Sequence, residues 1–68
     1  MKITAKSEVF ARARIVQGLS QRDLARRAGL SHSYISLLER SVKPVGPATA
    51  KRLSDLLQRQ VEELFEIH

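Results

Sequence analysis

The sequence predicts an all-α domain of five short helices. Three observations favour this fold class: apolar residues recur at helical spacing, serines and glycines suited to helix ends divide the chain at short intervals, and no segment is identified as a strand. A chain of 68 residues fits one small domain over residues 1–68. With 43% apolar and 28% charged residues, its composition is that of an ordinary globular protein.

The first helix is expected from Ser7 to about Gln17. Ser7 is a favourable N-cap, and Glu8 places negative charge near the N-terminus of the helix. Gly18 ends the helix, because glycine adopts the left-handed conformation of a helix end without steric cost. The stripe expected to face the core consists of Phe10, Ala13 and Gln17, flanked by Val9 and Val16.

Two short helices joined by a tight glycine turn are expected over about residues 20–40. The first begins at the N-cap Ser20, where Asp23 supplies a weak capping box, and it ends at Gly29. The second begins at the N-cap Ser31. The apolar positions of this pair are Leu24, Ala25, Ala28, Leu30, Ile35 and Leu38. Small residues that let the two helices approach closely, with a tight turn between them, are typical of a helix-turn-helix.

A loop and two further helices complete the predicted fold. Residues 41–46 are expected to form the loop, since Pro44 excludes a continuing helix. Pro47 suits the first position of a fourth helix, and a short fifth helix is expected from Val61 to about Ile67. The inward-facing residues of these two helices are Ala50, Leu53, Leu56, Leu57, Val61, Leu64 and Phe65.

The positive charge is concentrated in the first three quarters of the chain. Twelve basic and seven acidic residues give a net charge of +5. Residues 1–52 carry eleven basic and three acidic side chains, a net charge of +8, whereas residues 53–68 carry one basic and four acidic ones, a net charge of −3. This asymmetry suggests a polyanionic partner, although on charge alone a merely soluble basic domain remains an alternative.

The sequence offers little to catalysis or to a metal. It has no cysteine, only two histidines (His32 and His68), and neither a zinc-binding pattern nor a Gly-rich phosphate loop. The carboxylates of Glu62, Glu63 and Glu66 are interpreted as the solvated face of a helix. We therefore expect no enzyme activity, no cofactor and no metal site. No apolar stretch approaches the roughly 20 residues of a membrane span and no secretory signal is recognised, so a cytoplasmic protein is expected.

The outward face of the third helix is the most informative surface. Opposite its buried side lie short polar groups, one leucine and one arginine: Ser33, Ser36, Leu37 and Arg40, with His32 projecting from the first turn. Small side chains let a helix enter the major groove of DNA, where hydroxyls can contact base edges and a leucine can contact a thymine methyl. Alternatively, Leu37 is a scattered surface leucine that needs no explanation. From these residues alone the two interpretations stand equal.

The chain resembles the Cro/repressor-type (XRE-type) helix-turn-helix family. The resemblance is carried by the ungapped segments Gly18-Leu19-Ser20-Gln21-Arg22-Asp23-Leu24-Ala25, Ala28-Gly29-Leu30-Ser31-His32-Ser33-Tyr34-Ile35-Ser36 and Leu38-Glu39-Arg40, and it extends over about residues 8–66. It implies a lambda-repressor-like DNA-binding domain with the helix-turn-helix at the second and third helices. The function it implies is a sequence-specific double-stranded DNA-binding transcriptional regulator, expected to be a small repressor.

The resemblance also implies roles for individual residues. The base-reading positions are His32, Ser33, Leu37 and Gln21, the last also matching the family's glutamine that contacts a phosphate and braces the recognition helix. The positions that contact the DNA backbone are Ser31, Tyr34, Ser36, Arg40, Lys43 and Arg22. Arg14 and Glu39 match a structural salt bridge between the first and third helices. The alternatives are a water-facing His32 and a phosphate contact by Arg14.

Two departures from the family pattern affect these expectations. The family usually has glycine after the third helix, where this chain has Ser41, so a left-handed cap there is expected to be strained or absent. The path of the 41–46 loop is then open. The usual Gly-Val-Ser entry to the fifth helix is replaced by Gln58-Arg59-Gln60, so the joint between the last two helices is expected to be continuous or kinked.

The expected partner is double-stranded DNA, bound by a homodimer on two half-sites about 34 Å apart. The C-terminal residues Leu64, Phe65 and Ile67 are the expected dimer surface. We expect no membrane partner and no small-molecule effector. The alternative function is an antitoxin-like or other protein-interaction module built on the same fold.

Overall fold

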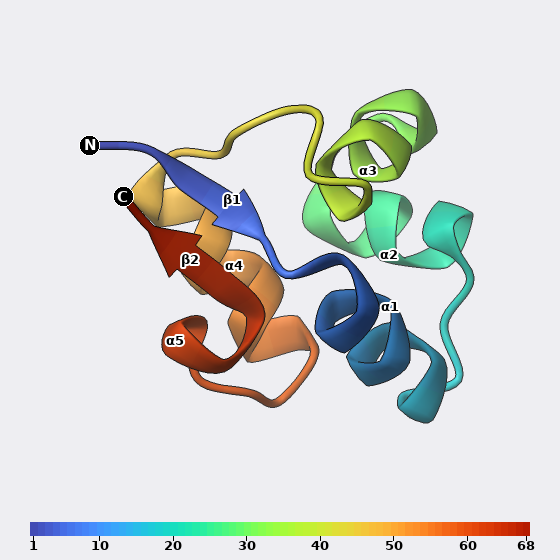
Figure 1. Ribbon diagram of the computed structural model, residues 1–68. Coiled ribbons are helices and arrows are strands. Elements are labelled where there is room, and N and C mark those ends of the chain that lie inside the picture. Colours follow the sequence, from blue (N-terminus) through green and yellow to red (C-terminus); the bar gives the residue numbers. More distant parts are fainter.

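The computed structural model describes residues 1–68 and contains five helices and a two-stranded antiparallel sheet (Figure 1). In chain order the elements are β1 (Ile3–Ala5), α1 (Ser7–Val16), α2 (Gln21–Ala28), α3 (His32–Glu39), α4 (Pro47–Leu56), α5 (Val61–Leu64) and β2 (Phe65–Ile67). In Figure 1, α1, α2 and α3 lie together on one side, and α4, α5 and the sheet lie on the other. The predicted arrangement of five short helices is confirmed. None of them is long and apolar enough to cross a bilayer.

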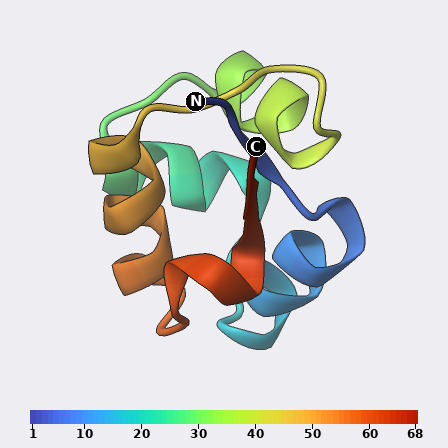
Figure 2. The ribbon, with the colours of Figure 1, turned by 60° about the vertical axis from the view of Figure 1, so that its left-hand side comes forward.

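The sheet joins the two ends of the chain, and neither of its strands is predicted from the sequence. Ile3 pairs with Ile67, and a reciprocal pair of backbone hydrogen bonds of 3.2 and 2.7 Å joins Lys2 to His68. The two termini consequently lie side by side (Figure 2). The fifth helix, expected to reach Ile67, ends at Leu64 because the chain becomes extended to pair with β1. The predicted helical fold class holds, and this small terminal sheet is an addition to it.

Sixteen buried apolar residues form one core between the elements. The rings of Phe10 and Phe65 meet edge to face at 5.7 Å and join α1 to β2. Leu64 and Phe65 are almost completely buried in this core, whereas Ile67 is 57% exposed. The expectation that the C-terminal residues form a dimer surface is thus wrong for Leu64 and Phe65, which the core of the same molecule covers.

The predicted helix starts agree with the structure at α2 and α3 but not at α1. The hydroxyl of Ser20 accepts from the N–H of Asp23, and that of Ser31 accepts from the N–H of Tyr34. Lys6, not Ser7, is the N-cap of α1. The Ser7 hydroxyl is instead hydrogen-bonded to another side chain, which removes it from a capping role.

The first four helices all end in the same way, with one residue in the left-handed conformation. These residues are Gly18, Gly29, Ser41 and Gln58. At α3 the N–H of Ser41 donates to the Leu38 carbonyl at 3.0 Å, and the next N–H, of Val42, donates to the Leu37 carbonyl at 2.9 Å. This is the Schellman pattern, which satisfies the last carbonyls of a helix. The left-handed Gln58 also ends α4 cleanly, so the joint before α5 is a sharp break.

The left-handed cap after α3 is present although the position is a serine. Ser41 has φ 62°, and its hydroxyl donates to the carbonyl of Ala5 and lies 3.1 Å from the Ser7 hydroxyl. These contacts offset part of the roughly 1–2 kcal/mol that the left-handed conformation costs a residue with a Cβ. Together with the N–H of Val45, which donates to the Ile3 carbonyl at 2.9 Å, they fix both ends of the 41–46 loop against β1.

Candidate nucleic-acid interface

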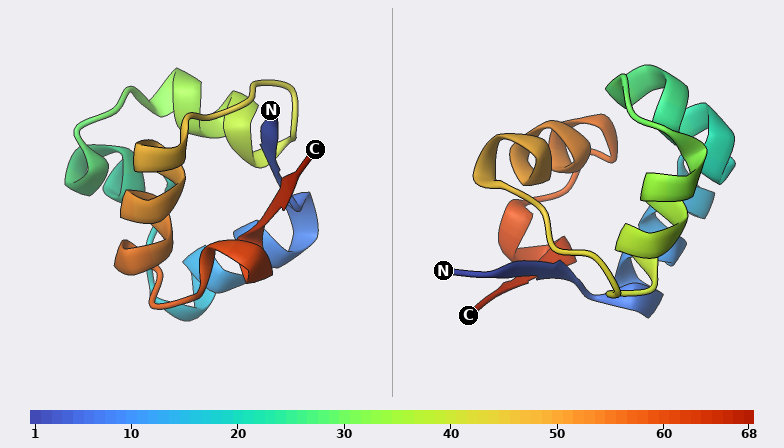
Figure 3. Two further views of the ribbon diagram at one scale, coloured as in Figure 1. Left: turned by 90° about the vertical axis from the view of Figure 1, so that its left-hand side faces the viewer. Right: turned by 90° about the horizontal axis from the view of Figure 1, so that it is seen from above.

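The position of α3 is set by its packing on α2. Ala25 and Ala28 are the small buried residues of α2, and Ile35 and Leu38 of α3 are completely buried. Small side chains on α2 let α3 approach closely, and the left-handed Gly29 makes the tight turn between them. One side of α3 is therefore fixed inward, and the opposite side lies at the upper surface of the molecule (Figure 3).

The outward side of α3 is open to solvent. His32, Ser33 and Arg40 are exposed, and Ser36 and Leu37 are partly exposed. No segment of the same chain covers this face. The structure thus places on one side of α3 and its C-cap five of the residues that the sequence predicts as DNA contacts.

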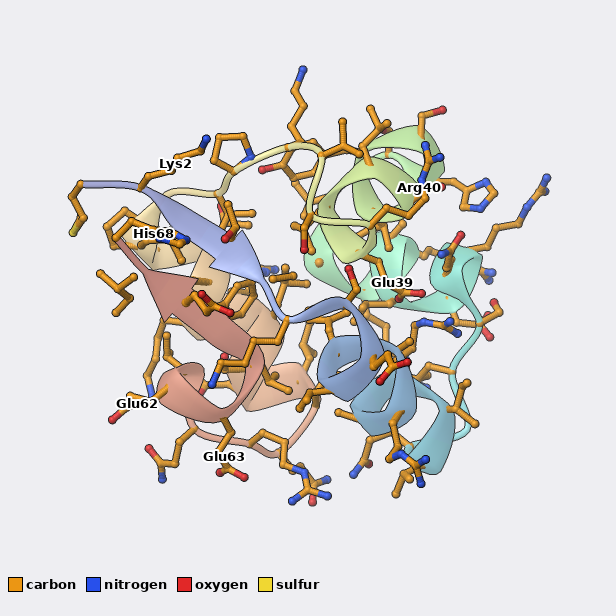
Figure 4. All side chains as sticks on the ribbon, viewed as in Figure 1. Lys2, Glu39, Arg40, Glu62, Glu63 and His68 are labelled. Carbon is orange, nitrogen blue, oxygen red and sulfur yellow. The ribbon has the colours of Figure 1, made fainter.

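An ion pair joins α3 to α1. The guanidinium of Arg14 donates from Nε to Oε1 of Glu39 at 2.8 Å and from Nη2 to Oε2 at 3.1 Å. A third donor, Nη1 of Arg14, reaches the Leu19 carbonyl at 2.8 Å. The two side chains are only 13% and 10% exposed. Figure 4 shows Glu39 where α3 meets α1 and α2. Two parallel charge-assisted hydrogen bonds in a shielded site hold the C-terminal end of α3 against α1.

Gln21, at the start of α2, bridges this ion pair and the tip of α3. Its Nε2 donates to Oε2 of Glu39 at 3.1 Å, and its Oε1 lies 3.3 Å from Nε2 of His32. Both polar atoms of the half-buried Gln21 amide therefore have partners within the protein. This arrangement matches the bracing part of the role that the sequence implies for Gln21.

Two further predicted contact residues take part in local structure. The hydroxyl of Ser31 caps α3, and the Tyr34 hydroxyl donates to the Pro44 carbonyl at 3.2 Å. Tyr34 also packs against the apolar core with part of its ring exposed. The tyrosine thus ties the loop after α3 to the helix itself.

Several exposed cations on α2, on α4 and in the segment 40–43 have no carboxylate partner. Arg22 on α2, Arg40 at the end of α3 and Lys43 in the following loop form no ion pair, and neither do Arg27 and Arg52. In Figure 4, Lys2 and Arg40 lie along the upper edge of the molecule, whereas Glu62 and Glu63 lie along the lower edge. Lys2 and Arg40 thus lie on the opposite edge of this view from the carboxylates of Glu62 and Glu63.

The start of α4 presents backbone donors rather than side chains. Gly46 is its N-cap and provides no side-chain hydrogen bond, and Pro47 follows at the first position. The amide N–H groups of Ala48 and Thr49 therefore remain available at the positive end of the helix dipole. The Gly-Pro sequence is the signal that predicts such an uncapped helix end.

Asp23 shows how tightly the start of α2 is fixed. Its carboxylate accepts from the backbone N–H of Ser20 at 3.0 Å and pairs with Arg26 at 3.2 Å. The pKa of Asp23 is lowered below its ordinary value of 3.8. The main cause is the hydrogen bond from the Ser20 backbone N–H, followed by the Ser20 hydroxyl and, with a smaller effect, the charges of Arg26 and Arg27. Arg26 is thereby drawn to a neighbour on its own helix.

An apolar surface lies on the outer side of α1. Val9 is 46% exposed, Ile15 63% and Val16 64%, and with Glu8, Ala11 and Arg12 they line a shallow groove. The prediction that Val9 and Val16 flank the core stripe is wrong, because α1 turns only Phe10 and Ala13 inward. Nowhere do three or more His, Asp or Glu side chains gather in a way that could hold a metal ion.

Comparisons with known proteins agree with this architecture. The hypothetical transcription factor NHTF from Neisseria is similar in structure, with a TM-score of 0.76 and 24% sequence identity over 84% of this chain. This chain spans 66% of the length of NHTF. The master regulator for biofilm formation SinR, solved in complex with DNA, has a TM-score of 0.74 and 26% identity over 82% of this chain and 90% of its own. No curated protein matches in sequence.

A family model described as helix-turn-helix matches residues 10–64, which is most of the chain. The matched range contains the α2–turn–α3 unit, the ion pair that holds it and the start of α4. The similar solved structures have the same fold. The chain therefore belongs to the helix-turn-helix family, in its Cro/repressor (XRE) type, whose members are DNA-binding transcription regulators.

Proposed function

We propose that this chain binds double-stranded DNA in a sequence-specific way and acts as a small transcriptional repressor, with α3 in the major groove. The observation that carries the proposal is the open outward face of α3, which presents short polar side chains and one leucine on a rigid support. The DNA complex of the similar SinR protein supports the same partner. Repression then follows from occupancy of an operator, which requires no catalysis and no cofactor.

The residues divide into two kinds of DNA contact. His32, Ser33 and Leu37 read base edges from the first two turns of α3, where hydroxyls, an imidazole and an apolar tip meet the groove. Gln21 supports them from α2. Contacts to the sugar-phosphate backbone come from the rim of the interface, namely from Ser31, Tyr34, Ser36, Arg40, Lys43 and Arg22. Such backbone contacts position the protein without reading sequence.

Electrostatics supplies much of the affinity in this proposal. The five exposed and unpaired cations of α2, α4 and the segment 40–43 can each neutralise one phosphate without giving up an existing partner: Arg22, Arg27, Arg40, Lys43 and Arg52. The free amides at the start of α4 add a further phosphate site. Release of condensed counterions then drives binding and makes it strongly dependent on salt.

We also propose that two copies bind together. The molecule measures 29 × 21 × 20 Å. Two copies placed side by side on one face of a duplex therefore bring their α3 helices about one helical turn, roughly 34 Å, apart. A dimer of this kind predicts an operator with two-fold symmetry.

Selection of bound duplexes from a random pool tests this function. The expected result is a short motif with two-fold symmetry that binds at least about 1,000-fold more tightly than random duplex, the lower end for specific binding. Recovery of unrelated sequences, all bound with the affinity of the starting pool, would contradict sequence-specific binding.

A second candidate function, an antitoxin-like protein-interaction module, is favoured by the exposed apolar residues of α1. Under this candidate, an apolar segment of a partner protein covers Val9, Ile15 and Val16, which the core leaves exposed. The variant Ile15→Lys then abolishes assembly with that partner, whereas Ser33→Ala does not affect it. If Ile15→Lys leaves assembly and duplex binding both unchanged, this candidate fails.

A further inference from the structure

Four side chains from three helices form one continuous hydrogen-bonded series that ends at the tip of α3. Arg14 of α1 binds Glu39 of α3 through two N–H groups at 2.8 and 3.1 Å. Glu39 accepts from Gln21 of α2 at 3.1 Å, and Gln21 lies 3.3 Å from Nε2 of His32. The first two members are nearly buried, and His32 at the other end is exposed. The donor and the acceptor of each hydrogen bond in the series are therefore fixed, from the buried ion pair to the exposed His32.

The direction of each hydrogen bond follows from the chemistry of the groups. An ionised carboxylate can only accept, so the side of the Gln21 amide that faces Glu39 must be its NH2 group. The amide oxygen of Gln21 therefore faces His32, and an oxygen can only accept. Nε2 of His32 must then carry the proton of this contact. The contact with Gln21 therefore selects one of the two neutral forms of the imidazole, the one with its proton on Nε2.

The consequence lies at the other ring nitrogen. A neutral imidazole has a single N–H, so with the proton on Nε2 the Nδ1 atom is a hydrogen-bond acceptor. Nδ1 has no hydrogen-bond partner in the structure, and the side chain is exposed on the first turn of α3. The ring thus offers a lone pair, and no proton, to whatever approaches Nδ1.

We infer that His32 selects a base that presents an exocyclic amino group in the major groove, either cytosine through N4 or adenine through N6. This inference rests on the proposed function and adds the class of base that one residue reads. Cytosine and adenine offer donors at these positions, whereas guanine N7 and O6 and thymine O4 offer only acceptors, which meet the Nδ1 lone pair unfavourably. Without Gln21 the imidazole could adopt either neutral form and would tolerate both classes of base.

The first part of the test needs no DNA. In nitrogen-15 NMR of the free, full chain at about pH 8, where histidine side chains are ordinarily neutral, we expect His32 to be protonated at Nε2 and not at Nδ1. In the variant Gln21→Met, which keeps the length of the side chain and removes its amide, we expect both neutral forms. A proton on Nδ1 of His32 in the unmodified protein overturns the inference.

The second part uses the duplex obtained by selection. The base pair read by His32 is the one at which the variant His32→Ala loses its preference. Replacing adenine there by purine, or cytosine by pyrimidin-2-one, removes only the amino group, and we expect the unmodified protein to lose affinity roughly five-fold, the worth of one hydrogen bond. The control variant Lys43→Ala should also bind the duplex without the amino group about five-fold more weakly than the unmodified duplex, because its missing phosphate contact does not depend on that amino group.

The outcomes separate the inference from the proposed function. Selection of guanine or thymine at the His32 position, or unchanged affinity after removal of the amino group, overturns the inference and leaves sequence-specific binding intact. If no duplex is preferred over random DNA, the proposed function fails and the inference fails with it.

Discussion

The buried carboxylate of Glu39 offers the sharpest test of how α3 is held. It accepts three hydrogen bonds, two from Arg14 and one from Gln21, and Glu39 as a whole residue is only 8% exposed. The variant Glu39→Gln keeps the size of the side chain but removes its charge. A neutral amide has one acceptor oxygen where the carboxylate has two, so N–H donors of Arg14 and Gln21 lose the second oxygen as their partner. The positive charge of Arg14 is then left without a negative charge beside it.

The size of the effect follows from this burial. Removing one member of a buried pair destabilises a protein by roughly 3–5 kcal/mol, and the lower value of about 3 kcal/mol suits a pair that keeps some contact with water. For a domain of this size, about 1 kcal/mol shifts the melting temperature by roughly 4–8 °C. We therefore expect Glu39→Gln to lower the melting temperature by about 12–24 °C in thermal unfolding followed by circular dichroism.

A matched control makes the result interpretable. The side chain of Glu62 is exposed and has no partner, so Glu62→Gln should change stability by at most about 0.5 kcal/mol. The double variant Arg14→Met with Glu39→Met should recover part of the loss, since it leaves no buried charge alone. A melting temperature of Glu39→Gln within about 3 °C of the unmodified protein would refute the reasoning, because so small a shift is what the loss of a solvent-exposed ion pair produces.

Three further predictions follow from other parts of the molecule. Gln58→Gly should raise the free energy of unfolding by about 1 kcal/mol in denaturant unfolding, because Gln58 has a left-handed backbone conformation and its side chain forms no hydrogen bonds. Ser41→Gly should gain less, since it also loses the hydroxyl contacts to Ala5 and Ser7. Equal gains in the two variants would contradict this prediction. The pKa of Asp23 is lowered in the folded protein. Its contribution to stability is therefore present above about pH 4, the pKa in the unfolded chain, and is lost as the pH falls below it. In an NMR titration the midpoint of Asp23 should lie below 3.8, and a midpoint above that value would exclude the capping contact. With five phosphates neutralised per copy, affinity for a half-site should fall about 500-fold between 50 and 200 mM salt, and Lys43→Ala should reduce the slope of log affinity against log salt by about 0.9; an unchanged slope would remove Lys43 from the interface.

The features that the sequence predicts well are those decided by neighbouring residues. Ser20 and Ser31 cap helices through N–H groups three residues away, and Gly29 ends α2 through its own backbone freedom. The buried positions of α2 and α3 follow from helical spacing alone. Such local signals depend on short stretches of chain, and this is why the sequence alone places the helix-turn-helix closely.

The features that it predicts poorly depend on contacts between distant residues. No strand is predicted at Met1 to Lys6, although its apolar and polar residues alternate, and β1 forms where β2 returns to pair with it. The left-handed Ser41 is stabilised by the carbonyl of Ala5, which no local pattern near residue 41 indicates. In the candidate site, the family pattern indicates that Gln21 braces α3, but only the structure shows that both ends of its amide are occupied.

The exposed outward face of α3 is the basis of the proposed function, and its base-reading role can be measured directly. The measurement is the base-preference profile of Ser33→Ala and Leu37→Ala beside that of Lys43→Ala, each obtained by selection from the same random pool. Reading by α3 predicts that the first two variants change which bases are preferred at one or two positions, whereas Lys43→Ala weakens binding to all sequences alike. Equal weakening by all three variants, with every base preference unchanged, would contradict the assignment of this face to the major groove.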